Sequence, residues 1–191
     1  MFIVINRYPR VLTLDSAGHP QCWSTWDEGI IYKVKDLIAW SIGDENMYYG
    51  GTNRISGLQS SVSVPSIIAI RNLNRAKTRK VALTNANLFG RDRYICAYCG
   101  KLTTGADSTR EHIIPQSRGG ENTWMNCVTA CKQCNNHKDC MLLSEARMEL
   151  LYVPYVPDRA EALIIENRNI LADQMEFLMA RLPKHSRMRV N

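Results

Sequence analysis

Short apolar runs, separated by polar and turn-forming residues, fill the first 80 residues of the chain. Residues 2–5 and 11–14 are apolar runs of strand length, and residues 15–18 have the composition of a turn. Residues 67–70 form a third apolar run, which predicts a buried strand. The Gly- and Ser-rich residues 50–61 predict a loop before it. We therefore expect a small module of short strands at this end of the chain.

A helical pattern begins at Thr25. Thr25 and Glu28 have the spacing of a capping box, in which each residue satisfies a free backbone N–H group of the other. We expect the helix to continue to a stop at Gly43. Its apolar face, at three- and four-residue spacing, would consist of Ile30, Ile31, Val34, Leu37 and Ile38.

Two further helices are predicted after residue 80. Residues 84–89 have the pattern of a short helix, and Asp158 with Glu161 begins a long helix that Pro183 ends. We expect the long helix to pack on its own domain, and a dimer-forming helix is the alternative. Its apolar face would consist of Ile164, Leu171, Met175, Leu178 and Leu182.

Composition places the chain among ordinary globular proteins. Its 191 residues suffice for one or two small domains, and 45% apolar with 22% charged residues is typical of soluble proteins. The apolar stretches are too short to span a membrane, so we expect no membrane partner. The run at residues 2–5 is too short for the apolar part of a signal peptide. These features predict an intracellular, cytoplasmic protein.

Two Cys-x-x-Cys pairs carry the most specific pattern in the chain. Cys96 and Cys99 form the first pair, and Cys131 and Cys134 form the second. Four thiolates complete a tetrahedral Zn²⁺ site, and in a reducing compartment this spacing serves metal binding more often than disulfide bonds. The residues between the pairs would then form a loop that the metal closes.

That loop holds the residues to which we assign chemistry. Glu111 and His112 lie inside it with Asn126, and Asn135 directly follows Cys134. Hydrolysis of a phosphodiester needs a base that activates water and a cation that binds the phosphate. His112 could be the base, and Glu111 could help to hold the cation. Neighbouring strand residues point to opposite faces, so this pair would need a local twist or bulge to act together.

These residues resemble the HNH nucleases, also called the ββα-metal family. The family pattern is Asp-His-x-x-Pro-x-Ser-x-Gly-Gly, then Asn, then Cys-x-x-Cys followed by Asn or His and a nearby Lys. Glu111 stands where the family usually has Asp, which adds one methylene and leaves the metal preference and the rate open. The other matching positions are His112, Pro115, Ser117, Gly119, Gly120, Asn126, Asn135 and Lys138.

The resemblance implies a role for each matched residue. His112 would be the general base, and Asn126 would brace the loop that orients it. Glu111 and Asn135 would hold one catalytic Mg²⁺ or Mn²⁺, since carboxylate and amide oxygens suit hard cations. His137 is the alternative to Asn135, because the family allows His at the third metal-binding position.

A basic balance of charge points to a polyanionic partner. The net charge is +6, and residues 71–80, just before the motif, include five basic residues and no acidic one. The alternative is that this run forms a solvated face. The candidates for DNA contact are Arg75, Lys77, Arg79, Lys80, Arg91, Arg93 and Arg118, together with Lys138, which the resemblance places near phosphate.

The resemblance implies an α+β fold in which a ββα-metal HNH nuclease unit with a four-cysteine zinc site carries extensions at both ends. The predicted domains are a strand-and-helix module at 1–80, the nuclease unit at 81–143, and a C-terminal helical extension with a basic tail at 144–191. The predicted function is metal-dependent cleavage of DNA. The alternatives are a non-catalytic zinc module that binds DNA, and a zinc-stabilised subunit of a larger phage or bacterial DNA-processing assembly. A homodimer is a further alternative for the assembly of the chain.

Overall fold

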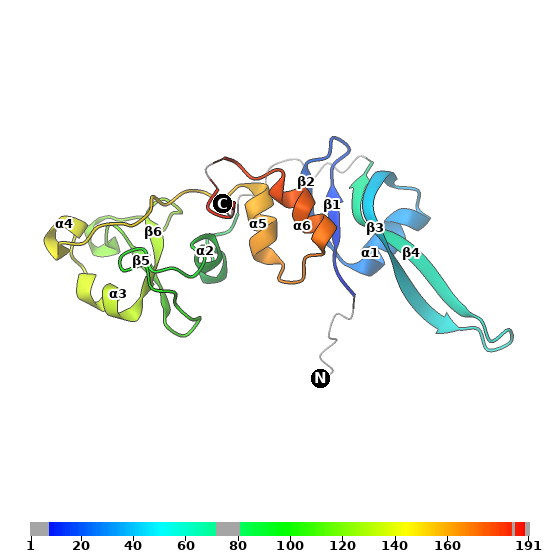
Figure 1. Ribbon diagram of the computed structural model, residues 1–191, viewed down its shortest axis with the longest axis horizontal. Helices are drawn as coiled ribbons and strands as arrows, with labels where there is room; N and C mark the ends of the chain where they lie inside the picture. The colour runs from blue at the N-terminus through cyan, green and yellow to red at the C-terminus, as the bar shows by residue number, and fades with distance from the viewer. Residues whose placement is uncertain (1–7, 72–80, 185, 190–191) are drawn as a thin grey trace. The chain divides into compact units, whose positions relative to one another are not determined.

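The computed structural model describes residues 8–71, 81–184 and 186–189, which form two compact units (Figure 1). Of the described residues, 8–71 and 166–182 form the first unit, and 81–165, 183–184 and 186–189 form the second. The segment expected as a separate C-terminal extension is thus divided between the two units. Within the described residues, no helix has both the length and the apolarity to cross a membrane.

A four-stranded sheet with the order β2-β1-β4-β3 forms the centre of the first unit. β1 (Val11–Leu14) pairs antiparallel with β2 (Pro20–Ser24) and parallel with β4 (Gln59–Ile70), which pairs antiparallel with β3 (Ile38–Thr52). The predicted strands at 11–14 and 67–70 and the turn at 15–18 are confirmed. The strand predicted at 2–5 lies outside the described residues.

The loop predicted at residues 50–61 is confirmed for residues 53–58 and wrong for the other half of the stretch. Residues 50–52 end β3 and residues 59–61 begin β4, with Tyr49 opposite Ser61 and Thr52 opposite Gln59. Cross-strand pairing gives the backbone of this Gly- and Ser-rich stretch its hydrogen bonds. Composition does not reveal such pairing, because each strand finds its partner in another segment of the chain.

Helix α1 (Trp26–Val34) begins as predicted and ends earlier than predicted. Both hydrogen bonds of the capping box between Thr25 and Glu28 are present. The stop expected at Gly43 is wrong, because the chain turns at Asp36, whose φ is 52°. The N–H groups of Asp36 and the next residue donate to carbonyls of the last turn, which is a Schellman end, and the following segment enters β3.

Polar side chains attach helix α6 (Ala172–Met179) to the sheet of the first unit. The Gln174 amide is buried and donates to the carbonyls of Arg10 and Ser66, each at 2.8 Å. The Asp173 carboxylate accepts hydrogen bonds from the Ser66 hydroxyl and, at 2.9 Å, from the backbone N–H of Asp44. These bonds connect α6 to β3 and β4.

The single long helix predicted from Asp158 is wrong, although its start is confirmed. Asp158 and Glu161 exchange the two expected capping bonds, at 2.8 and 2.9 Å. Helix α5 (Arg159–Glu166) then stops well before α6 begins. Between them, the side chain of Asn167 accepts from the N–H of Asn169 and donates to its carbonyl. Such local side-chain bonds compete with the helical backbone pattern and break the helix.

The second unit contains a strand–strand–helix motif. Strands β5 (Ser108–His112) and β6 (Cys127–Cys131) pair antiparallel, and β6 leads directly into α3 (Lys132–Lys138). Thr84 caps α2 (Asn85–Arg91), which confirms the short helix predicted there. The remaining elements are the short 3₁₀ helix η1 (Gln116–Arg118), α4 (Leu143–Ala146) and all but the last residue of α5. The chain is therefore of the α+β class, with a ββα unit at the predicted place.

Arg91 is the buried polar centre of this unit. Its guanidinium pairs with Asp92 at 2.8 Å and donates to the backbone carbonyls of Trp124, Cys127 and Tyr155. Neither Arg91 nor Asp92 has any exposed surface. The prediction that Arg91 contacts DNA is therefore wrong, because its donors are used inside the fold.

Candidate metal centre and active site

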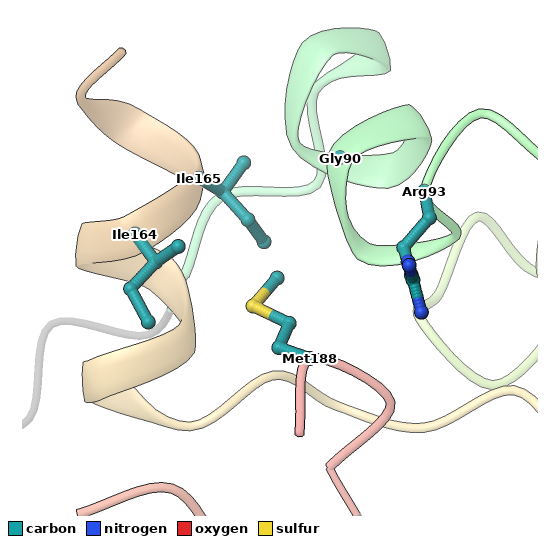
Figure 2. A pocket seen from close by; sticks show the side chains of 5 residues that line it. All are labelled: Gly90, Arg93, Ile164, Ile165 and Met188. Carbon is teal, nitrogen blue, oxygen red and sulfur yellow. The ribbon is translucent and has the colours of Figure 1, made fainter. Parts of the chain in front are cut away.

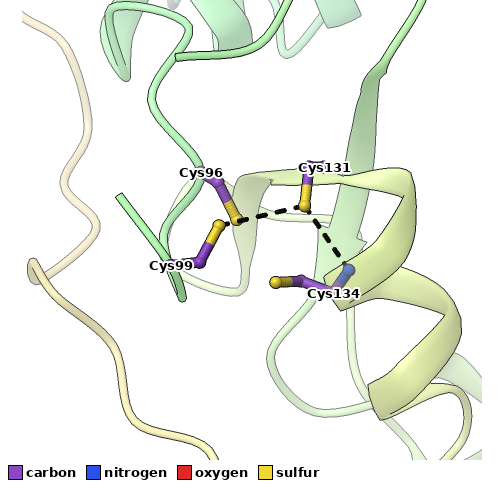
Figure 3. Close-up of side chains that lie close together, drawn as sticks. All are labelled: Cys96, Cys99, Cys131 and Cys134. Carbon is purple, nitrogen blue, oxygen red and sulfur yellow. Dashed lines mark hydrogen bonds between the residues drawn. The ribbon is translucent and has the colours of Figure 1, made fainter. Parts of the chain in front are cut away.

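The four cysteines of the two Cys-x-x-Cys pairs lie together in the second unit (Figure 3). Cys96 and Cys99 lie on a tight turn, in which the N–H of Gly100, whose φ is +73°, donates to the carbonyl of Cys96. Cys131 ends β6 and caps α3, so Cys134 follows one helical turn later. Local turns thus present the members of each pair on the same side.

Distances between the sulfurs fit a tetrahedral site. All four Sγ atoms lie within 4.8 Å of one another, and those of Cys99 and Cys131 are 3.9 Å apart. Sulfurs at the usual Zn–S distance of about 2.3 Å, on the corners of a tetrahedron, would be roughly 3.8 Å apart. The donor set and its spacing therefore fit a metal such as zinc.

Backbone hydrogen bonds prepare one of these thiols for metal binding. Burial raises the pKa of the Cys96 thiol, but hydrogen bonds from the backbone at Cys99, Cys131 and Tyr98 outweigh burial and lower this pKa to about 7. The thiolate is the form that binds metal. The pKa values of the Cys99 and Cys134 thiols are raised instead, that of Cys134 by burial and by the neighbouring thiols.

Glu111 and His112 are the last two residues of β5. They pair with Val128 and Cys127 in an unbroken register, so their side chains point to opposite faces of the strand, without the bulge that the sequence left open. Burial raises the pKa of the Glu111 carboxyl, and the ammonium of Lys138 opposes this rise. The His112 ring is half-buried, and its Nε2 atom is buried with no hydrogen-bond partner in the described part of the chain.

Lys138, at the end of α3, connects this pair of residues. Its Nζ atom lies 2.6 Å from Oε1 of Glu111 and 2.8 Å from the backbone carbonyl oxygen of His112. Lys138 has no exposed surface, and Glu111 is 5% exposed. The Lys138 ammonium is therefore used inside the fold, and we do not expect it to donate a hydrogen bond directly to a phosphate at the surface.

Asn126 fixes the chain that follows His112. Its side-chain oxygen accepts the N–H of Ile114 at 2.9 Å, and its amide nitrogen donates to the carbonyls of Ile114 at 3.0 Å and Glu121 at 2.9 Å. Gly120 lies in the same loop, where an added Cβ would come within 1.7 Å of the Ile114 carbonyl oxygen. The loop closes only with a glycine at this position.

Asn135 and His137 differ in their placement on α3. Asn135 is three residues before Lys138, so both lie on the face of the helix that packs on β5, and Asn135 is half-buried. His137 is exposed and is rotated by about 100° from Lys138. The helix therefore places Asn135, rather than His137, on the same side as the Glu111 carboxylate.

A family comparison covers this part of the chain. Residues 96–151 match the model of a family described as HNH endonuclease. The match contains both cysteine pairs and all motif positions from Glu111 to Lys138. This segment is similar to the HNH endonucleases. The predicted family and the predicted ββα fold are thereby confirmed.

The HNH segment also resembles part of a much larger protein. The CRISPR-associated endonuclease Cas9 of Corynebacterium diphtheriae is 43% identical over 44 residues, which is 22% of this chain and 4% of that protein. The chain thus spans a small part of the relative that it matches.

The remaining candidates for DNA contact differ in position. In the HNH segment, Arg118 is exposed and its guanidinium pairs with Glu145 at 2.8 Å. Arg93, just before the segment, is exposed as well. The other four, Arg75, Lys77, Arg79 and Lys80, lie outside the described residues.

Two features near the HNH motif were not predicted. One is the ion pair between Lys138 and Glu111. The sequence could have indicated it, because Lys138 lies three residues after Asn135 and therefore on the same helix face. The other is Tyr98, between the first two cysteines, whose hydroxyl is buried without a hydrogen-bond partner in the described chain. Burial raises the pKa of Tyr98, and the nearby charge of Glu111 raises it further.

The second unit also has a pocket of about 290 Å³ beside α2 and α5 (Figure 2). Three apolar side chains and one arginine surround it, and none of the motif residues does. The lining residues are Gly90, Arg93, Ile164, Ile165 and Met188. We assign no chemistry to this pocket.

Proposed function

We propose that this protein is a metal-dependent HNH endonuclease that hydrolyses phosphodiester bonds of DNA. The observation that carries this proposal is the end of β5, where the Glu111 carboxylate contacts Lys138 of α3 and the His112 side chain points to the other face of the strand. Asn126 holds the turn that follows by three hydrogen bonds. A binding module has no need for a general base on such a rigid support, whereas catalysis depends on its position.

His112 acts as the general base in this proposal. Imidazole exchanges protons near neutral pH, and a positioned base of this kind takes a proton from the water that attacks phosphorus. Asn126 acts through His112 by keeping the turn after β5 in one conformation. It is a positioning residue rather than a catalytic one.

Glu111 and Asn135 would hold a catalytic Mg²⁺ or Mn²⁺. The carboxylate and the amide belong to the oxygen ligands that these ions prefer, and Oε2 of Glu111 accepts no hydrogen bond from the described part of the chain. When bound, the cation supplies stabilisation of the charge that develops on the phosphate. His137 is the alternative ligand, and its exposed position makes Asn135 our choice.

The cysteine cluster would hold a structural zinc ion. Its four sulfurs have the spacing of a closed tetrahedral site, which leaves no open position for a substrate. In small modules of this kind, metal binding contributes much of the folding free energy. We therefore assign zinc to the stability of the HNH segment and not to the reaction.

DNA is the substrate that the family and the charge of the chain favour. The net charge of +6 attracts a polyanion, and the exposed Arg93 and Arg118 remain candidates for phosphate contact. We extend this proposal to Arg75, Lys77, Arg79 and Lys80. Reversing the charge of Arg75, Lys77 and Arg79 together should weaken DNA binding and reduce its salt dependence.

A plasmid-nicking assay with Mg²⁺ or Mn²⁺ tests the function, with EDTA as the metal-free control. His112→Ala should lower the single-turnover rate by about 10²- to 10⁴-fold, the range for loss of a general base. His19→Ala, an exposed histidine of the first unit, is the matched control and should cut at the wild-type rate. Excess Mn²⁺ should partly restore Glu111→Ala and Asn135→Ala, because those variants would weaken cation binding.

Cleavage by His112→Ala at the wild-type rate would overturn the assignment of the general base. DNA binding without cleavage by the wild-type protein would favour the non-catalytic zinc module. Cleavage only in the presence of further components would favour a subunit of a larger DNA-processing assembly.

A further inference from the structure

We propose that Lys138 is an internal counter-cation of the catalytic metal site, and that it makes tight binding of the divalent cation dependent on DNA. In the free protein, Lys138 would neutralise Glu111 and weaken cation binding. A DNA phosphate would then supply the negative charge that the site lacks. This inference rests on the proposed function, since it concerns the same site.

The first argument is the division of the Glu111 carboxylate between two partners. Oε1 pairs with the ammonium of Lys138 at 2.6 Å. Oε2 accepts no hydrogen bond from the residues that the structure describes, and it is the oxygen left for a cation. A cation bound to Oε2 would therefore share the Glu111 carboxylate with the Lys138 ammonium.

The second argument is the charge of the site. Glu111 contributes one negative charge, Lys138 one positive charge, and Asn135 none. His112 and Asp139 also act on Glu111 electrostatically, His112 in the same direction as Lys138 and Asp139 in the opposite direction. Asp139 is exposed and therefore screened by water. Oxygen sites that bind divalent cations tightly in the absence of substrate usually combine several carboxylates. The net charge of Glu111, Lys138 and Asn135 is zero, so this site lacks the electrostatic attraction for a divalent cation that several carboxylates provide.

The third argument is that Lys138 cannot move aside. It has no exposed surface, and it also donates to the His112 carbonyl at 2.8 Å. Displacing the ammonium would break both of its hydrogen bonds and leave a buried positive charge without a partner, which is strongly unfavourable. The positive charge would therefore remain beside the bound cation, and a phosphate is the group that could offset both charges.

Titration of the full-length, zinc-loaded protein with Mn²⁺, followed by electron paramagnetic resonance, tests this proposal. The measurement is made in a His112→Ala background, so that an added DNA duplex stays uncut. The duplex should tighten Mn²⁺ binding by roughly 5- to 150-fold, the usual range for two coupled ligands. An Mn²⁺ affinity that the duplex does not change would overturn the proposal without use of any Lys138 variant.

Variants of Lys138 test whether this residue causes the effect of DNA on the Mn²⁺ affinity. In the same background, Lys138→Met should tighten Mn²⁺ binding by the DNA-free protein and reduce the gain from DNA, whereas Lys138→Arg should keep both near the parent values. Lys132→Met removes an exposed positive charge from the same helix, so it should leave both values unchanged. Weaker or unchanged Mn²⁺ binding by folded Lys138→Met would also overturn the proposal.

Folding is checked by circular dichroism and thermal melting without divalent cation. Lys138→Met leaves Glu111 unpaired, so its melting temperature should fall, and Glu111→Gln combined with Lys138→Met should recover part of the loss. A purely structural Lys138 would change the melting temperature but not the Mn²⁺ affinity of the folded fraction. DNA cleavage by the protein with His112 intact is a separate measurement, and its absence would contradict the proposed function and not the role of Lys138.

Discussion

Asn126 holds Ile114 by both atoms of its side-chain amide. Oδ1 accepts the N–H of Ile114 at 2.9 Å, and Nδ2 donates to the carbonyl of the same residue at 3.0 Å. Because Ile114 lies two positions after His112, this pair of bonds sets the direction in which the chain leaves β5.

Replacing Asn126 with alanine should therefore destabilise the second unit. The variant removes both hydrogen bonds to the backbone of Ile114, and because Ile114 is exposed, each loss should cost about 0.5–1.5 kcal/mol of unfolding free energy. Chemical denaturation measures this loss. Asn136→Ala, at an exposed position on α3, is the control and should change the unfolding free energy by less than about 0.5 kcal/mol. Equal stability of the two variants would contradict the bracing role of Asn126.

Gly120→Ala should be more harmful than other glycine substitutions in this unit. The added methyl group would lie 1.7 Å from the Ile114 carbonyl oxygen and 2.9 Å from Nδ2 of Asn126, so the backbone of the loop would have to move. Gly105→Ala is the matched control, because no atom lies within 4 Å of the added group. We expect a lower melting temperature and slower DNA cleavage for Gly120→Ala only. Similar melting and cleavage of both variants would show that the loop tolerates the shift.

Cys96→Ser or Cys131→Ser should release zinc and unfold residues 91–140. Loss of one thiolate opens the tetrahedral site, and in small modules metal-binding free energy is largely folding free energy. Atomic absorption measures the zinc content, and thermal melts measure the stability. Cys140→Ser, at an exposed cysteine outside the cluster, should keep its zinc. A Cys96→Ser protein that retained one zinc per chain and melted like the wild type would exclude the four-cysteine site.

Asp173 should make the first unit sensitive to acid. Burial raises the pKa of its carboxyl, but hydrogen bonds from Ser66, Asp44 and Gln174 outweigh burial and lower this pKa below its ordinary value of 3.8. A lowered pKa in the folded state contributes stability that is complete above the unfolded-state pKa and is lost as the pH falls through the folded-state pKa.

Asp173→Asn should therefore reduce the unfolding free energy at pH 7, on the order of 1–2 kcal/mol for the loss of bonds to a charged group. The difference from the wild type should shrink as the pH falls below about 4. Asp44→Asn, whose side chain is exposed, is the control for a change of charge. Denaturation curves from pH 7 to pH 2 test this, and a difference that does not vary with pH would exclude Asp173 as the cause.

Features that depend on neighbours in the chain could be read from the sequence. The capping boxes at Thr25 and Asp158 form within four residues, and each Cys-x-x-Cys pair forms on one turn. The order of motif residues also identified the family and its ββα fold. Local features are encoded locally, because the groups that satisfy one another are adjacent before the chain folds.

Features that depend on distant segments were decided by tertiary structure alone. The sequence made Arg91 and Lys138 look like surface cations, yet Arg91 donates to a carbonyl 64 residues away and Lys138 pairs with a carboxylate 27 residues away. The hairpin of β3 and β4 was hidden by a loop-like composition. Burial and strand pairing arise only when remote segments meet, and a basic side chain carries no local mark of whether a carboxylate or water will be its partner.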